Sequence, residues 1–380
     1  MRDVRIAEVY DVIQDKARKV ALATNKSIEL EKRYILKNLE EKNIMIKVGI
    51  IGCGFMGTVH ANCYNILEDV KVVGVSDIST ERAEKIVNLS KSKFFADSDE
   101  LINCSEIDAI DICLPTYLHK EFILKCCNAK KDIFCEKPFT LNLKDTEEII
   151  TKIKEAKVKL MIGMVLRFWP EYIEFKRIVD SKKFGKLKVL KCTRISAPPI
   201  YGWDNWYFDP NRSGSAALDL HIHDVDYIYY LLGKPKSVYS LGKNDKKGWQ
   251  HICSAYRYRD TIVNAEGGWD LSKSYGFMQE IRGVFEDGTV IEYNSKTQPL
   301  IIYKEKNSEL LNITKDKINS INTDGNISEI RGYYNEIKYW IECLQNNKYP
   351  ERVTPEDAKE SLEIVLQEIK SAEIGKEILL

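Results

Sequence analysis

The sequence lacks the features of several specialised protein classes. Its ten cysteines include no CxxC pair, its 57 basic and 57 acidic residues cancel, and no apolar run is long enough to span a membrane. The first residues are rich in charge, without the continuous apolar core of a signal peptide. Scattered cysteines are typical of free thiols in a reducing compartment. We therefore expect a cytoplasmic protein that binds neither nucleic acid nor membranes.

The most informative stretch is a β-branched run at residues 46–51 that breaks into a glycine-rich loop. The loop reads Gly52-Cys53-Gly54-Phe55-Met56-Gly57. This Gly-x-Gly-x-x-Gly spacing predicts a strand, a tight turn and a helix whose N-terminus binds a pyrophosphate. Gly52 permits the turn, Gly54 admits the phosphate, and Gly57 lets the helix lie close to the strand. An ordinary strand–turn–helix is the alternative.

A second predicted strand, residues 70–76, ends at Asp77, 20 residues beyond Gly57. A dinucleotide-binding fold places there the carboxylate that binds the adenosine ribose hydroxyls. Such a carboxylate repels a 2′-phosphate, and no arginine follows at once, since Arg82 is expected inside the next helix. We therefore predict NAD rather than NADP.

Strand and helix signals alternate as far as residue 165. We predict further strands at 93–95, 109–114, 132–135 and 160–164, and helices at 79–90, 116–129 and 142–157. This alternation predicts a parallel sheet with helices on both faces and ligands at the carboxyl ends of its strands.

Two polar motifs follow strands of this sheet. The first comprises Leu114, Pro115, Thr116 and His119, which we expect to bind the cofactor through backbone and hydroxyl groups, and the second is Glu136-Lys137-Pro138. Pro138 favours an extended Lys137, so its ammonium can act over the cleft as a proton donor or oxyanion clamp. The alternative is a solvated surface Glu–Lys pair.

The remainder of the sequence predicts an α+β domain that begins near Arg167. A helix to about residue 182 and a strand at 187–196 precede a loop dense in aromatic residues. Such a loop is typical of a pocket wall for a sugar ring. Its candidate substrate contacts are Tyr201, Trp203, Trp206 and Tyr207.

One helix is predicted over residues 215–232. Asp219, His223 and Asp226 lie at i, i+4 and i+7, so they share one side beside the apolar face. A histidine bracketed by carboxylates can serve as general acid or base, although a buried structural histidine is the alternative. His221 faces elsewhere, so we expect no metal site.

Strands then recur at 237–242, 250–258, 262–269, 277–285 and 290–293, which favours a mostly antiparallel sheet. Residues 305–328 are expected to be a surface excursion, and two helices close the chain, the last capped by Thr354. We divide the chain into a helical N-terminal extension (1–44), a Rossmann NAD-binding domain (45–165) and a substrate and oligomerisation domain (166–380). The closing helix, 355–373, is expected to pack back on the Rossmann domain.

Together these motifs resemble the Gfo/Idh/MocA oxidoreductases, relatives of glucose–fructose oxidoreductase and inositol 2-dehydrogenase. The resemblance covers roughly residues 45–380 and implies a Rossmann domain followed by a domain with a large open sheet. It implies a catalytic set of Lys137, Asp219 and His223. We also predict Glu136, Lys137 and Arg167 among the residues that bind the cofactor. The first 44 residues have no counterpart in the family pattern. His221 stands where many relatives carry a small residue, so it is a further candidate substrate contact.

The sequence thus predicts an NAD-dependent dehydrogenase that transfers hydride between a sugar or cyclic polyol and the nicotinamide. The alternatives are a glycoside-cleaving enzyme that uses NAD transiently and a non-catalytic NAD-binding sensor or scaffold. The open sheet favours a homodimer or homotetramer. The N-terminal arm is a candidate contact with a neighbouring subunit or a partner.

Overall fold

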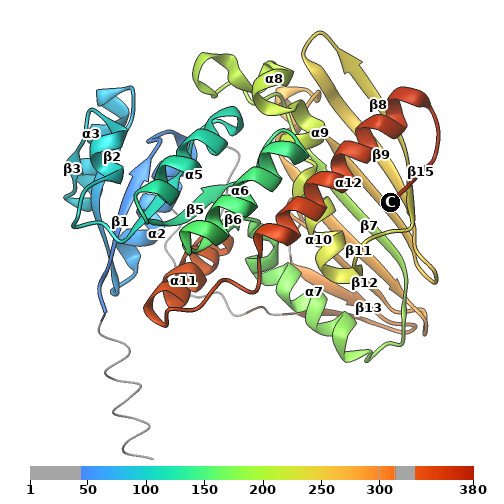
Figure 1. The fold of residues 1–380 in the computed structure, drawn as a ribbon. Coiled ribbons are helices and arrows are strands. Elements are labelled where there is room, and N and C mark those ends of the chain that lie inside the picture. Colours follow the sequence, from blue (N-terminus) through green and yellow to red (C-terminus); the bar gives the residue numbers. More distant parts are fainter. Residues whose placement is uncertain (1–43, 298, 312, 314–329) are drawn as a thin grey trace, which may run out of the picture. The chain divides into compact units, whose positions relative to one another are not determined.

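Two sheets organise residues 46–380, which form one unit (Figure 1). The computed structural model describes residues 44–297, 299–311, 313 and 330–380. The predicted helical extension, apart from Ile44, lies outside the described residues.

The first sheet is parallel, with the strand order β3-β2-β1-β4-β5-β6. Its strands are β1 (Ile46–Ile51), β2 (Val70–Ser76), β3 (Lys93–Phe94), β4 (Ala109–Ile112), β5 (Asp132–Glu136) and β6 (Leu160–Gly163). The helices along this part of the chain are α2 (Phe55–Ile66), α3 (Thr80–Ser90), α4 (Ser98–Ile102), α5 (His119–Asn128) and α6 (Leu143–Ala156). The order reverses between β1 and β4, and this switch point is where doubly wound sheets bind ligands. The predicted Rossmann architecture is confirmed.

The second sheet has the order β14-β13-β12-β11-β7-β10-β9-β8-β15, and among these strands only β7 and β10 pair in parallel. Its strands are β7 (Leu187–Ile195), β8 (Ser237–Asp245), β9 (Gly248–Arg257), β10 (Ile262–Gly268), β11 (Met278–Phe285), β12 (Val290–Asn294), β13 (Leu300–Tyr303), β14 (Ser308–Leu311) and β15 (Ile378–Leu379). Burial alternates along β11, as expected for a sheet with one face on the core.

The second half of the chain also contributes helices, some of which pack on this sheet and some on the first sheet. They are α7 (Pro170–Ser181), α8 (Pro210–Ser213), α9 (Ser215–Asp219), α10 (Ile222–Leu232), α11 (Arg331–Gln345) and α12 (Pro355–Ile374). α12, drawn in red in Figure 1, packs against β8 and α10 on one side and against α6 and β6 on the other. Its N-terminus carries a capping box between Thr354 and Asp357.

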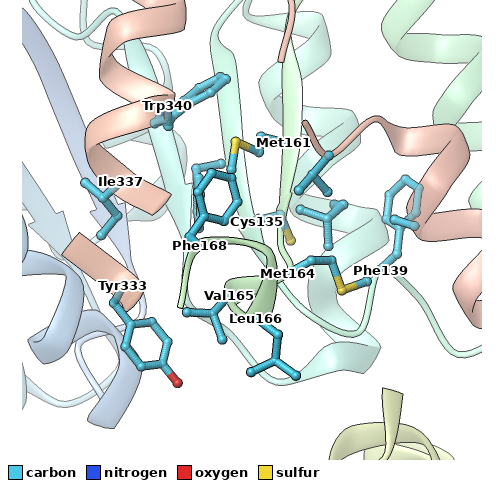
Figure 2. Close-up of a cluster of buried hydrophobic side chains, with 14 of the residues drawn as sticks. Cys135, Phe139, Met161, Met164, Val165, Leu166, Phe168, Tyr333, Ile337 and Trp340 are labelled. Atoms are coloured by element: carbon cyan, nitrogen blue, oxygen red, sulfur yellow. The ribbon is translucent and has the colours of Figure 1, made fainter. Parts of the chain in front are cut away.

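α11 completes the core of the first sheet although it lies far along the chain. Tyr333, Ile337 and Trp340 recur at helical spacing and form one buried stripe. Figure 2 shows all three side chains projecting from α11 within the buried cluster that also contains Phe168 and Met161. The core of the nucleotide-binding half therefore needs residues from both ends of the described unit.

Two expectations need correction. The single helix predicted over residues 215–232 is broken into α9 and α10, because the amides of both Leu220 and His221 donate to the Ala216 carbonyl and widen the turn. Within the predicted surface excursion, Ser308–Leu311 forms the edge strand β14, while residues 314–329 lie outside the described part. No helix among the described residues is long and apolar enough to cross a membrane.

Candidate active site

The glycine loop joins β1 to α2 with no room for side chains at two of its positions. Gly52 has φ +95°, and a Cβ there would lie 2.4 Å from the Cys113 carbonyl oxygen. A Cβ on Gly57 would lie 1.9 Å from the Gly52 carbonyl oxygen, so this glycine serves the close packing of α2 on β1. A Cβ on Gly54 would meet nothing within 4 Å. The backbone is therefore open at the position where a phosphate would approach.

Asp77 lies beside this loop at the end of β2. Its carboxylate accepts hydrogen bonds from the amides of Cys53 and Ser79, both at 2.7 Å. Arg82 in α3 donates to it from Nη2 at 2.6 Å. The carboxylate is thus held in place before any ribose binds. The contact with Arg82 has no counterpart in the sequence prediction, which placed that residue in the helix without a role.

A cavity of about 880 Å³ runs from the glycine loop to the second sheet. This volume falls in the range of small-molecule and cofactor pockets. The predicted site residues that line it are Gly52, Gly54, Phe55, Met56, Asp77, Leu114, Pro115, Glu136, Lys137, Tyr201, Trp203, Trp206, Tyr207, Asp219 and His223. The open backbone at Gly54, the uncapped first turn of α2 and the prepositioned Asp77 together fit a dinucleotide.

Lys137 and Asp219 form the polar centre of the cavity. The Lys137 ammonium donates to the Asp219 main-chain oxygen at 2.8 Å and to its carboxylate at 3.2 Å. Burial raises the pKa of the Asp219 carboxyl, and the adjacent Lys137 partly offsets this rise. Two of the three ammonium protons are thus engaged, and one is left for a ligand.

His223 lines the same cavity from the first turn of α10. Burial lowers the pKa of its imidazole well below 6.5, and the charges of Lys137 and Arg194 lower it further. The neutral imidazole can accept a proton at neutral pH. Its Nδ1 is buried without a hydrogen-bond partner, so no carboxylate sets its tautomer, contrary to the bracketing expected from the sequence.

Family models match most of this unit. The model "Oxidoreductase family, NAD-binding Rossmann fold" matches residues 46–164, and the "GFO/IDH/MocA C-terminal domain" matches residues 172–290. The chain belongs to the Gfo/Idh/MocA oxidoreductase family. It is therefore an NAD-binding oxidoreductase of that family, as the sequence motifs predicted.

Relatives of this Gfo/Idh/MocA chain include inositol dehydrogenases. A myo-inositol 2-dehydrogenase of Thermotoga maritima is 35% identical over 191 residues, 50% of this chain and 55% of the relative. The NAD(+)-dependent scyllo-inositol 2-dehydrogenase of Bacillus subtilis is 28% identical over 345 residues, 88% of this chain and 96% of the relative. The chain thus matches only about half the length of the first of these relatives and nearly all of the second.

Among solved structures, the myo-inositol 2-dehydrogenase of Lactobacillus plantarum has the same fold. Its TM-score is 0.73 at 23% identity, over 88% of this chain and 99% of that one. At this identity, the likeness concerns the fold alone.

Arg167, assigned to the cofactor, does not line the cavity. Its buried guanidinium donates to the Asp226 carboxylate at 2.7 and 2.9 Å and to Asp357 at 3.1 Å. The carboxylate of Asp226 therefore faces Arg167, not His223. The sequence prediction for Asp226 was wrong because helical spacing alone put its carboxylate beside His223, whereas its partner Arg167 lies 59 residues away along the chain.

Three further predicted contacts are buried away from the cavity. The two ring nitrogens of His119 lie 2.8 Å from the Leu114 and Pro138 carbonyl oxygens. Thr116 is buried in the short turn before α5. The imidazole of His221 is fully buried and lies 3.2 Å from the Glu368 carboxylate of α12, so it offers no surface to a substrate.

A buried charge cluster that the sequence did not indicate lies next to Lys137. His60 in α2 is fully buried, with Nδ1 2.9 Å from Asp111 and Nε2 3.1 Å from Glu136. Burial alone would lower the pKa of His60, but its contacts with Asp111 and Cys113 together outweigh that effect and the pKa is raised. Glu136, which also accepts the amide of Lys137 at 3.2 Å, is therefore held by a buried imidazolium. The helical position of His60, with no motif around it, gave no sign of this contact.

Proposed function

We propose that this chain is an NAD-dependent dehydrogenase that oxidises a secondary hydroxyl of a cyclic polyol or sugar. The observation that carries the proposal is the convergence of Lys137, Asp219 and the neutral His223 in the cavity that begins at the glycine loop. The names of the inositol dehydrogenase relatives agree with this substrate class. NAD, when bound along the loop, supplies the hydride acceptor.

In this proposal His223 is the general base. Its depressed pKa keeps the imidazole neutral and able to take the hydroxyl proton. Lys137 points its free ammonium proton at the same oxygen and stabilises the negative charge that develops there. Asp219 positions that ammonium through two contacts.

The cofactor proposal is NAD rather than NADP. A 2′-phosphate would be placed next to the Asp77 carboxylate, whose one cationic partner, Arg82, is already engaged. Replacing Asp77 by Ser removes the repulsion and frees Arg82. We expect this variant to raise the kcat/KM ratio of NADP over NAD, measured at a saturating polyol. An unchanged ratio would remove Asp77 as the selecting group.

The aromatic side chains that line the cavity favour a ring-shaped substrate. Trp206 and Tyr207 stack with ring centroids 4.0 Å apart, and Tyr201 contacts Tyr207 edge-on at 5.8 Å. Such faces accept the apolar C–H side of a sugar or inositol ring while its hydroxyls reach polar groups.

The test is NADH production, followed by absorbance, over a panel of inositols, aldoses, amino sugars and uronic acids. Stoichiometric NADH supports a dehydrogenase, whereas glycoside cleavage without net NADH supports the glycoside-cleaving alternative. His223→Ala is expected to abolish turnover and to leave NAD binding in place. His251→Ala, which removes a histidine from β9 outside the cavity, is the matched control. Turnover that survives in His223→Ala would exclude this histidine as the base, and NAD binding without turnover of any substrate would favour a sensor.

A further inference from the structure

Three side chains on the outer face of the second sheet bring metal-ligand atoms together. His251 and Cys253 of β9 flank the buried Ile252, so they share the face of the sheet that points away from the core. Glu266 of β10 is the register partner of Cys253. An imidazole nitrogen, a thiol sulfur and a carboxylate oxygen from these residues lie within 4.8 Å of one another. The three side chains do not line the cavity, so they form a separate cluster.

The imidazole of His251 is held with one nitrogen directed at this cluster. A Cβ on Gly268, its partner on β10, would lie 2.4 Å from Nδ1, so the ring lies over a position without a side chain. Nδ1 lies 2.8 Å from the Asp270 carboxylate, which the Lys243 ammonium also contacts at 3.1 Å. This contact favours a proton on Nδ1 and leaves Nε2, 3.1 Å from Glu266, as the ligand nitrogen. A carboxylate behind the imidazole is the usual outer partner of a metal-bound histidine.

The spacing and the donor set fit Zn²⁺. Two ligand atoms bound at about 2.1 Å to a tetrahedral ion lie about 3.4 Å apart, close to the 3.1 Å between His251 Nε2 and the Glu266 carboxylate. The side chains of His251 and Glu266 are 21% and 33% exposed, and Cys253 is exposed, so a cation can reach them from solvent. A mixed nitrogen, sulfur and oxygen set suits Zn²⁺, with water in the fourth position.

An ion pair by itself does not account for the thiol. All ten cysteines and all five histidines lie in the described part of the chain, where Cys253 is the one exposed cysteine and His251 the one histidine that is not buried. Cysteine is usually buried, so packing does not explain its place beside this histidine. The Cys253 side chain, Asp270 and Glu266 raise the pKa of His251 to about 9, so the cluster already stabilises a positive charge at the imidazole.

We propose that His251 Nε2, Cys253 Sγ and a carboxylate oxygen of Glu266 bind a Zn²⁺ ion on the outer face of the second sheet. Asp270 is then a positioning residue, which acts through His251. Binding displaces the thiol proton and the Nε2 proton of the imidazolium. The ion joins β9 to β10 and stabilises the folded chain, because an unfolded chain does not hold the three ligands together. The proposal does not depend on the dehydrogenase function.

The test titrates Zn²⁺ into the full chain after treatment with EDTA, at neutral pH, by calorimetry. Co²⁺ is a second probe, because a cobalt–thiolate bond absorbs in the near ultraviolet and reports on the thiol directly. The ligand variants are Cys253→Ser and Glu266→Gln, which leave no buried charge without a partner. Their matched controls are Cys104→Ser, at a half-buried cysteine of the first half, and Glu292→Gln, at a half-buried glutamate of β12.

For wild type and both controls, we expect one saturable Zn²⁺ site per chain, a thiolate absorption with Co²⁺ and a Tm that rises with the Zn²⁺ concentration. Cys253→Ser and Glu266→Gln should each lose the site and the rise in Tm, and should keep the Tm of the metal-free protein. Asp270→Asn should keep the stoichiometry and weaken Zn²⁺ binding by about 10- to 100-fold.

Two outcomes would overturn the proposal. If wild type binds Zn²⁺ no more tightly than Cys253→Ser does, the cluster is only an imidazolium paired with carboxylates. If Zn²⁺ binds but Co²⁺ gives no thiolate absorption, or if both ligand variants bind as wild type does, the ion lies elsewhere on the chain. Either outcome leaves the dehydrogenase function standing, because that function is tested in the cavity.

Discussion

The sequence and the structure predict different roles for Arg167, so replacing this residue distinguishes between them. The sequence prediction places it among the cofactor-binding residues, whereas the structure buries it between Asp226 and Asp357. Arg167→Met removes the cation and leaves the Asp226 carboxylate, itself 1% exposed, without its partner. Breaking a buried pair from one side costs about 3–5 kcal/mol of unfolding free energy.

This loss of unfolding free energy lowers the melting temperature by a measurable amount. With an unfolding entropy of about 2 cal/mol/K per residue over residues 46–380, it corresponds to a fall in Tm of roughly 4–7 °C. Thermal unfolding by circular dichroism measures this shift, and calorimetric titration below the transition measures the Kd of NAD. We expect a lower Tm with an unchanged Kd, because Arg167 does not line the cavity.

Two further variants separate the ion pair from its surroundings. Arg167→Met/Asp226→Leu removes both charges and should recover much of the lost stability, since no unpaired buried charge remains. Arg177→Met, on the exposed side of α7, should leave Tm unchanged. A variant Arg167→Met with wild-type Tm and a large increase in the Kd of NAD would refute the structural role.

Three more predictions follow from the site. The acid limb of kcat/KM should lie below pH 6.5, because the pKa of His223 is lowered and only its neutral form accepts a proton; a limb above pH 7 would contradict this assignment. His60→Gln should destabilise the protein most below about pH 6.5 and progressively less at higher pH, because the raised pKa of the folded state contributes stability that is lost as the pH rises through it. Urea unfolding at pH 6 and pH 9 measures the difference, and equal losses of unfolding free energy would argue against a buried imidazolium. Gly57→Ala should disrupt the packing of α2 on β1 and lower Tm, while Gly54→Ala should fold normally and weaken NAD binding; the reverse order would invalidate the assigned roles of the two glycines.

Much of the nucleotide-binding half could be predicted from short-range patterns. The spacing of Gly52, Gly54 and Gly57 and the position of Asp77 describe a local turn and the next strand end, and the structure has both. The alternation of strands and helices was equally informative, because it allows few connections other than right-handed crossovers. Lys137 was predictable for the same reason, since residues at the ends of parallel strands meet at one edge.

The second half was less predictable at the level of single residues. Asp219 and His223 do line one cavity as expected, but the widened turn at Leu220 and His221 separates α9 from α10. Helical spacing alone could not foresee that break, since it depends on a carbonyl that accepts two amides. Asp226 lies on the same helix as His223, but its carboxylate faces Arg167, and helical spacing could not indicate a partner 59 residues away along the chain.

The sequence by itself thus determined the fold class, the phosphate loop and the polar residues at the strand ends, because each depends on neighbours a few positions away. Only the tertiary structure decided which buried charges face the cavity and which face one another. Arg167 meets Asp226 across 59 residues and Asp357 across 190, while Arg194 keeps one donor unpaired at the cavity wall. The two arginines differ because Asp226, Asp357 and the Arg352 carbonyl give each guanidinium nitrogen of Arg167 an acceptor, whereas Asp224 and Gln279 leave Nη2 of Arg194 without one.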